Sequence, residues 1–258
     1  MNSIIHSTHP DMSKLPGGFE PKSINIDFDS TCLSKTRIKE VSDSTLILHN
    51  VFSKDDCNKL INLMMQSPNF ESVSIQGRKD IPDARIGSIR TTVWSPELAE
   101  KFYKKMYYMF EPRFTNEFTA TDWWQGNKER KAWLPNGVSP MLRMMRYEKS
   151  GQHYAHYDAA FIYPEDRFRT LMSFVVYLTT NDDGATRFIN DKQSNIPIWD
   201  RDHKDWIREA REDEVIFKSK PVQGDVLLFD HRLCHDVEKY TGDGPRIIIR
   251  GDVLYKAY

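Results

Sequence analysis

The segment His156-Tyr157-Asp158 contains two side chains that can bind a metal ion, an imidazole and a carboxylate. If the segment is extended, His156 and Asp158 point to the same side, because side chains alternate along a strand. A third ligand must come from elsewhere in the fold, and His235 is the candidate because it follows a predicted strand at residues 225–229. Two histidines and one carboxylate on one side of a metal leave the other positions open. Such a centre suits non-haem Fe(II) that must also bind a co-substrate and dioxygen.

The His-x-Asp motif has an ordinary alternative, because such tripeptides occur by chance and a lone one is usually a surface turn. His153 and His231 also stand close to the candidate ligands in the sequence, so either imidazole is an alternative. The metal-site interpretation therefore needs support from the residues around the motif.

Three predicted strands carry polar or aromatic side chains at every second position, which places them on one face of each strand. These faces hold Arg143, Met145 and Tyr147; Ser173, Val175 and Tyr177; and Arg246, Ile248 and Arg250. A buried arginine needs an anion, and the nearby sequence supplies no obvious carboxylate at a fixed spacing. A bound dicarboxylate fits that role, because a guanidinium binds a carboxylate through two parallel hydrogen bonds. The alternatives are that each tyrosine packs in the core and that Arg246 is a solvated charge on an edge strand.

The elements that must position these residues follow from hydrophobic spacing and from turn residues. Residues 45–49 are a short apolar run typical of a strand. Ser53 with Asp56 three residues later predicts the start of a helix, and Ser95-Pro96-Glu97 predicts the start of a second. The second half holds short β-rich segments at residues 141–148, 170–179, 214–218, 225–229 and 245–255. Helices followed by many short strands favour an α+β fold, a helix-flanked β-sandwich or barrel, over alternating βαβ units.

Two segments are less regular. Residues 1–43 are polar and rich in turn residues, which predicts an extension that precedes a domain at residues 44–258. Residues 72–92 contain glycines and arginines and are predicted to form a mobile loop with one or two strands. Residues 77–92 within this segment are a candidate lid over a substrate, with Arg85 and Arg90 as substrate contacts. An ordinary mobile surface loop is the preferred alternative for this segment.

Composition argues against several classes of function. The 258 residues include 36 Lys and Arg against 37 Asp and Glu, so a net charge of -1 gives no reason to expect a nucleic-acid partner. No apolar run reaches the roughly 18 residues of a membrane span, and the first residues lack the pattern of a secretory signal. The three cysteines are scattered, which argues against a disulfide framework or a thiolate zinc site. We therefore expect a cytoplasmic protein with no membrane partner.

The candidate residues lie in three segments, RYEKSGQHYAHYD, SFVVYLTTNDDGATRF and GDVLLFDHRLCHDVEKYTGDGPRIIIRGDVLY. In this order they resemble the prolyl 4-hydroxylase group of 2-oxoglutarate- and Fe(II)-dependent dioxygenases. The resemblance covers residues 141–255, and ILHNVFSKDDCNKLINLM is similar to the family's N-terminal strand and helix. The sequence departs from the family in a long charged insert at residues 190–213, of which residues 203–212 have helical spacing. Residues 1–43 have no counterpart.

The resemblance implies a double-stranded β-helix (jelly-roll) core flanked by N-terminal helices. It also implies a catalytic iron whose ligands are His156, Asp158 and His235. Arg246 would bind the distal carboxylate of 2-oxoglutarate, with Tyr177 and Tyr147 lining the same pocket. Arg246 lies eleven residues after His235, slightly farther than is usual in the family, so Arg250 on the same face is the alternative anchor.

The activity that the resemblance implies is hydroxylation of a C–H bond, coupled to conversion of 2-oxoglutarate and O2 into succinate and CO2. Fe(II) and 2-oxoglutarate would be required, with ascorbate (vitamin C) as a further candidate cofactor. The expected substrate is a prolyl residue of a protein or peptide. Three alternatives stay open: an oxygenase of a small molecule or nucleobase, a catalytically silent jelly-roll that binds a partner, and a zinc hydrolase with the same ligands.

Overall fold

The computed structural model describes residues 22–30, 37–42, 44–66, 71–72, 85–114, 118–119, 132–163, 168–196, 200, 202 and 208–257. Within these residues the helices are α1 (Lys54–Met65), α2 (Pro96–Phe114) and the 3-10 helix η6 (Glu212–Glu214). The strands are β1 (Arg37–Ser42), β2 (Thr45–His49), β3 (Glu71–Ser72), β4 (Arg85–Trp94), β5 (Phe118–Thr119), β6 (Ala132–Val138), β7 (Met141–His156), β8 (Phe168–Tyr177), β9 (Thr186–Ile189), β10 (Val215–Ser219), β11 (Val226–Asp230), β12 (His235–Val237) and β13 (Arg246–Ala257). None of the helices in this described part of the chain is long and apolar enough to cross a membrane.

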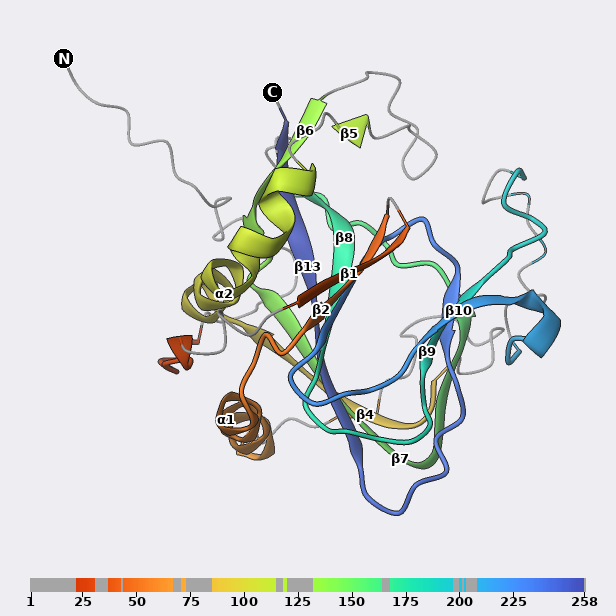
Figure 1. Ribbon diagram of the computed structural model, residues 1–258, viewed down its shortest axis with the longest axis horizontal. Coiled ribbons are helices and arrows are strands. Elements are labelled where there is room, and N and C mark those ends of the chain that lie inside the picture. Colours follow the sequence, from red (N-terminus) through yellow and green to blue (C-terminus); the bar gives the residue numbers. More distant parts are fainter. Residues whose placement is uncertain are drawn as a thin grey trace.

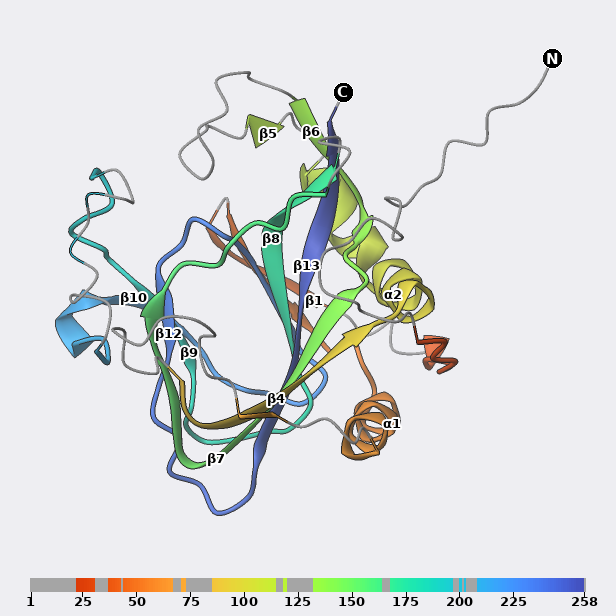
Figure 2. The same ribbon diagram turned by 180° about the vertical axis from the view of Figure 1, so that it is seen from behind.

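The strands form one curled antiparallel sheet. Its order is β1-β2-β11-β8-β13-β7-β12-β9-β10, while β4 pairs with β7 and β6 pairs with β13. Helices α1 and α2 lie on one side of the long strands β8 and β13, and the short strands β9 and β10 lie on the other side (Figures 1 and 2). This arrangement is a double-stranded β-helix core flanked by N-terminal helices, so the fold predicted from the sequence is confirmed.

The curl creates two apolar layers, and β8 contributes to both because all ten of its residues are buried. Phe174 and Val176 belong to the cluster that also contains Leu60 of α1 and Phe102 of α2. Val175 and Tyr177 of β8 belong to a second cluster inside the curl. A strand covered on both faces reads as a nearly continuous apolar run, as residues 171–178 do apart from Ser173.

Both predicted helix starts are confirmed, because each depends on local hydrogen bonds. Ser53 caps α1: its hydroxyl accepts from the Asp56 backbone, and the Asp56 carboxylate accepts from the Ser53 backbone. The hydroxyl of Ser95 likewise accepts a hydrogen bond from the backbone of Leu98, in the first turn of α2. These contacts satisfy N–H groups that a helix leaves without partners at its start.

One of the strands predicted within residues 72–92 is present, and it occupies the second half of the candidate lid at residues 77–92. Residues 85–94 form strand β4, which pairs with β7, so Arg85 and Arg90 stand on a strand. Gly87, which suggested a loop, has a φ of 60° and lies at a register shift between the two strands. It is therefore a bulge residue of the kind that glycine permits. Residues 77–84 lie outside the described residues.

Two further expectations concern the insert and the N-terminal extension. Residues 208–211 are not helical, because the backbone N–H of Ala210 donates to the Asp236 carboxylate and not to a carbonyl one turn earlier. Residues 203–207 of the predicted helix lie outside the described residues. In the extension, residues 37–42 form strand β1 against β2, and Ile24 is buried in the cluster beside the helices.

Candidate metal centre

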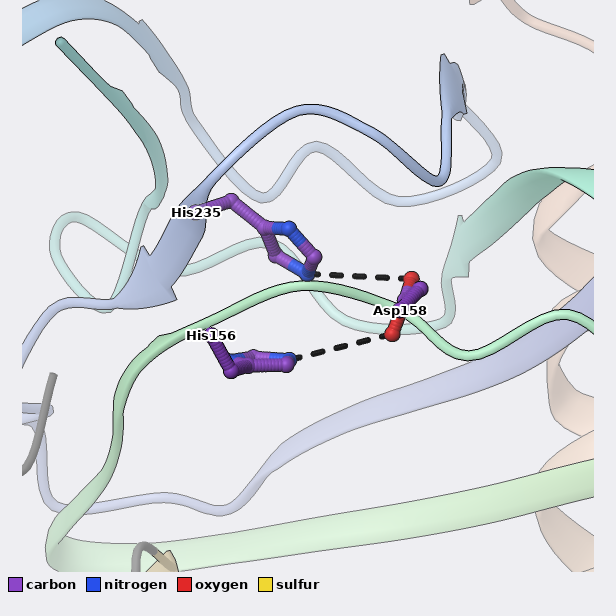
Figure 3. Close-up of side chains that lie close together, drawn as sticks. All are labelled: His156, Asp158 and His235. Atoms are coloured by element: carbon purple, nitrogen blue, oxygen red, sulfur yellow. Dashed lines mark ion pairs between the residues drawn. The ribbon is translucent and has the colours of Figure 1, made fainter. Parts of the chain in front are cut away.

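Strand pairing brings three potential metal ligands together. His156 is the last residue of β7, and His235, the first residue of β12, is its direct cross-strand partner. Asp158 lies two residues beyond the end of β7. Its Oδ1 is 3.8 Å from Nε2 of His156, and its Oδ2 is 3.7 Å from Nε2 of His235. Figure 3 shows the three side chains pointing toward one another, and one ligand atom from each lies within 4.8 Å of the others.

The two histidines are held so that they present a lone pair to this point. Nδ1 of His156 lies 2.8 Å from the carbonyl of Tyr154, and Nδ1 of His235 lies 2.9 Å from the carbonyl of Leu233. A carbonyl can only accept, so Nδ1 carries the proton and Nε2 is left free to bind a metal. Burial lowers the pKa of both imidazoles, that of His156 well below its usual value, which favours the neutral, metal-binding form.

The Asp158 carboxylate is buried and receives a donor on each oxygen. Ser173 of β8 donates to Oδ2 at 2.6 Å, and Arg250 of β13 contacts Oδ1 at 2.8 Å. Burial alone would raise the pKa of Asp158, but the positive charge of Arg250 holds it well below its usual value. Two neutral imidazoles and one ionised carboxylate are a donor set that fits a divalent cation such as Fe(II).

The alternative histidines lie elsewhere. His231 is buried with its Nε2 3.2 Å from Oδ1 of Asp252, so it does not join the group of three. His153 lies against the ring of His156, with the ring centroids 3.7 Å apart, and its Nε2 accepts from Arg85. Among the described residues the structure therefore brings together the three side chains that the sequence selected.

Arg246 lies inside the curl without an anion. Its side chain is fully buried, and within the described part of the chain none of its three guanidinium nitrogens has a hydrogen-bond partner. The guanidinium carbon is 4.8 Å from the ring centroid of Tyr147 and 5.8 Å from that of Tyr177. The Tyr177 hydroxyl is 3.1 Å from both Thr186 Oγ1 and Ser219 Oγ. A buried cation with unpaired donors is a site for an anionic ligand.

Arg250 differs from Arg246, because its guanidinium contacts the carboxylates of Asp158 and Asp252. The expectation that no carboxylate stands at a fixed spacing is therefore wrong for Arg250. Asp252 comes two residues later on the same strand, and the alternation of side chains could have revealed it. Asp252 also binds Arg143 of β7 at 2.9 Å. Of the two arginines considered for the co-substrate, Arg246 is the one whose three guanidinium nitrogens all lack a partner among the described residues, whereas on Arg250 this holds for Nε.

Comparison with known proteins agrees with this geometry. Residues 142–251 match the model of the 2OG-Fe(II) oxygenase superfamily, and this range includes all three candidate ligands. This region of the chain is similar to that superfamily. The resemblance found in residues 141–255 is thereby confirmed at the level of 2OG-Fe(II) oxygenases, a family that uses Fe(II), 2-oxoglutarate and O2. No curated protein matches the sequence closely enough to count as a relative.

Several solved structures are similar in fold to this chain. OsALKBH1 has 13% sequence identity and a TM-score of 0.51, over 83% of this chain and 100% of that one. A viral collagen prolyl hydroxylase from Paramecium Bursaria Chlorella virus-1 has 15% identity and a TM-score of 0.46, over 84% and 99% of the two chains. A Pseudomonas putida prolyl-4-hydroxylase has 13% identity and a TM-score of 0.48, over 83% and 93%. At these identities the likeness concerns the fold alone.

Proposed function

We propose that this protein is a 2-oxoglutarate- and Fe(II)-dependent dioxygenase that hydroxylates a C–H bond, with a prolyl residue of a protein or peptide as its substrate. Fe(II) would be held by Nε2 of His156, Nε2 of His235 and the Asp158 carboxylate. The distal carboxylate of 2-oxoglutarate would bind Arg246. The bound iron, with 2-oxoglutarate and O2, supplies the oxidising power for hydroxylation, and succinate and CO2 are released.

Arg246 is the observation that carries the proposal. Its three unpaired nitrogens lie inside the curled sheet with the metal candidates, on the strand that also supplies Arg250 to Asp158. A guanidinium in such surroundings binds a carboxylate strongly, because water does not compete for its donors. Tyr147 and Tyr177 pack their rings beside the guanidinium and restrict its position. Arg246 thereby orients one end of the co-substrate while the other end faces the metal.

The prolyl substrate is supported by the sequence motifs shared with the prolyl 4-hydroxylase group over residues 141–255. The same motifs, with the family's chemistry, make ascorbate a candidate reductant for the iron. A protein or peptide substrate also agrees with the net charge of -1, since nucleic-acid enzymes usually carry a basic surface.

The first test is an anaerobic visible spectrum of the Fe(II)-loaded protein with and without 2-oxoglutarate, beside the Asp158→Ala variant. We expect a charge-transfer band in the wild-type protein that is absent from the variant. The absence of a band in folded, iron-loaded wild-type protein would overturn the proposal in favour of a silent binding protein. Zinc binding with hydrolysis that does not depend on 2-oxoglutarate would favour a zinc hydrolase.

The substrate class is tested separately by mass spectrometry. The enzyme is incubated with 2-oxoglutarate, O2, ascorbate and either proline-containing peptides, free amino acids or single-stranded oligonucleotides. Addition of one oxygen atom to a prolyl residue, matched by succinate formation, supports the proposed substrate. Oxygen addition to one of the other two pools alone would replace the prolyl substrate with that class and leave the oxygenase assignment intact.

A further inference from the structure

We propose that Arg250 is a positioning residue that fixes the Asp158 carboxylate for the metal, with Asp252 compensating its charge and Ser173 holding the second oxygen. The inference rests on the proposed function, because it concerns the same metal centre. It assigns a role to three residues that would not bind the metal themselves, on the basis of their contacts with Asp158 and with one another.

Asp158 needs restraint more than the two histidines do. His156 and His235 stand on paired strands, and each ring is also bonded to a backbone carbonyl. Asp158 instead follows β7 in a stretch without regular structure, at residues 157–160. The backbone there has no strand partner to define its direction, so the orientation of the carboxylate must come from side-chain contacts.

The contacts on Asp158 come from two different strands. Ser173 of β8 donates to Oδ2 at 2.6 Å, and Arg250 of β13 contacts Oδ1 at 2.8 Å. The two donors also touch each other, since Arg250 Nη2 lies 3.1 Å from Ser173 Oγ. Because one oxygen is held from each strand, the carboxylate cannot rotate without losing a charge-assisted or buried hydrogen bond. Each oxygen keeps a further lone pair that a metal can use.

A cation beside a metal ligand also has a cost, because it repels the metal. Two like charges that lie this close together in a protein interior repel each other strongly unless a counter-charge lies beside them. Asp252 supplies that counter-charge. Its Oδ1 is 3.3 Å from Arg250 and its Oδ2 is 2.9 Å from Arg143, and Nε2 of His231 lies 3.2 Å from Oδ1. Arg250 can therefore hold Asp158 as part of a charge-compensated network.

Replacing Arg250 by lysine distinguishes an effect of where the positive charge lies from an effect of the charge itself. Arg250→Lys keeps the positive charge but shortens the side chain, so the charge no longer reaches the position from which Arg250 Nη2 contacts Asp158, Asp252 and Ser173. Arg143→Lys is the matched control, because Arg143 binds the same Asp252 but, within the described part of the chain, forms no ion pair with Asp158. Co(II), added anaerobically to the purified full chain, is the probe. Its affinity and visible spectrum report the metal site without requiring turnover.

We expect Arg250→Lys to weaken Co(II) binding by about 10- to 100-fold and to change the Co(II) spectrum, as is typical when a partner of a metal ligand is altered. Arg143→Lys should stay within about 2-fold of the wild type and keep the wild-type spectrum. Ser173→Ala, which removes a small hydroxyl with little effect on packing, should weaken binding in the same direction if Arg250→Lys does not fold.

Wild-type affinity and spectrum in both Arg250→Lys and Ser173→Ala would overturn the inference, as would equal losses in Arg250→Lys and Arg143→Lys. These results differ from failure of the proposed function. In that case the wild-type chain itself would bind no Co(II), or would bind Co(II) without any response to 2-oxoglutarate.

Discussion

Replacement of Arg246 by methionine should change stability and co-substrate binding in opposite directions. Methionine is close to arginine in length and carries no charge. In the ligand-free protein Arg246 is fully buried and has no hydrogen-bond partner among the described residues. The variant therefore removes an uncompensated buried cation and leaves an apolar side chain between two tyrosine rings.

The magnitude follows from two opposing contributions. An unsatisfied buried charged group costs about 3 kcal/mol or more, whereas the cation–π contacts with Tyr147 and Tyr177 contribute about 0.5–1 kcal/mol each. The difference predicts a variant that is more stable by about 1–2 kcal/mol. For a chain of this size the midpoint of thermal unfolding should rise by about 2–8 °C.

Binding of 2-oxoglutarate should weaken at the same time. Loss of one partner of a buried, hydrogen-bonded charge pair costs about 2–5 kcal/mol, which corresponds to an increase in Kd of about 30- to 4,000-fold. Circular dichroism of the ligand-free protein measures the first effect. Anaerobic titration of the metal-loaded protein with 2-oxoglutarate measures the second.

Arg250→Met is the matched control for this experiment. Arg250 contacts Asp158 and Asp252, so its removal leaves two buried carboxylates without their guanidinium and should lower the unfolding midpoint. An Arg246→Met variant that is destabilised as much as Arg250→Met, and that still binds 2-oxoglutarate with the wild-type Kd, would refute the reasoning. Arg246 would then be a structural residue.

Three further outcomes are expected. Gly184→Ala should weaken 2-oxoglutarate binding at least about tenfold in the same titration. Gly184 has a φ of 73°, and the Cβ of the new alanine would lie 2.9 Å from Cδ of Arg246. An unchanged Kd would contradict the placement of the Arg246 side chain. Leu48→Ala should lower the free energy of unfolding in urea by about 2–5 kcal/mol, because Leu48 is completely buried beside the helices, and a loss below about 1 kcal/mol would show that the site collapses around the cavity. Glu214→Gln should lower the free energy of unfolding by about 1 kcal/mol at pH 7, with allowance for solvent around its arginine partners. Hydrogen bonds from Arg208 hold the pKa of Glu214 below its usual value. The carboxylate therefore stabilises the fold above about pH 4.5 and loses that effect as the pH falls. Urea unfolding at pH 7 and pH 3 should show the difference between wild type and Glu214→Gln shrinking, and a constant difference would contradict the assignment.

The parts of the fold that were predictable from the sequence are those set by local chemistry. Ser53 and Asp56 form the start of α1 through bonds within four residues, and Ser95 does the same for α2. The apolar strands were also predictable, since a segment such as residues 226–230 has few ways to bury its side chains other than in a covered strand.

The local sequence pattern was misleading in segments whose backbone conformation is set by contacts with residues far away in the sequence. Gly87 is typical of a loop, but here its positive φ forms a bulge against Gly151, and β7 supplies the hydrogen bonds that make residues 85–94 a strand. The helical spacing before Glu214 is overridden because Asp236, which is distant in sequence, accepts the Ala210 N–H. Neither partner can be read from the segment itself.

The same distinction between local and distant contacts applies to the residues of the candidate site. The sequence by itself determined that His156 and Asp158 can face one point, and that Arg246 and Arg250 share a face, because both relations depend only on the two-residue period of an extended chain. Only the tertiary structure decided that His235 pairs with His156 while His231 contacts another carboxylate. It likewise decided that Arg250 is paired and Arg246 is not. These outcomes depend on strand register and on where buried carboxylates lie, and both are set by contacts between residues far apart in the chain.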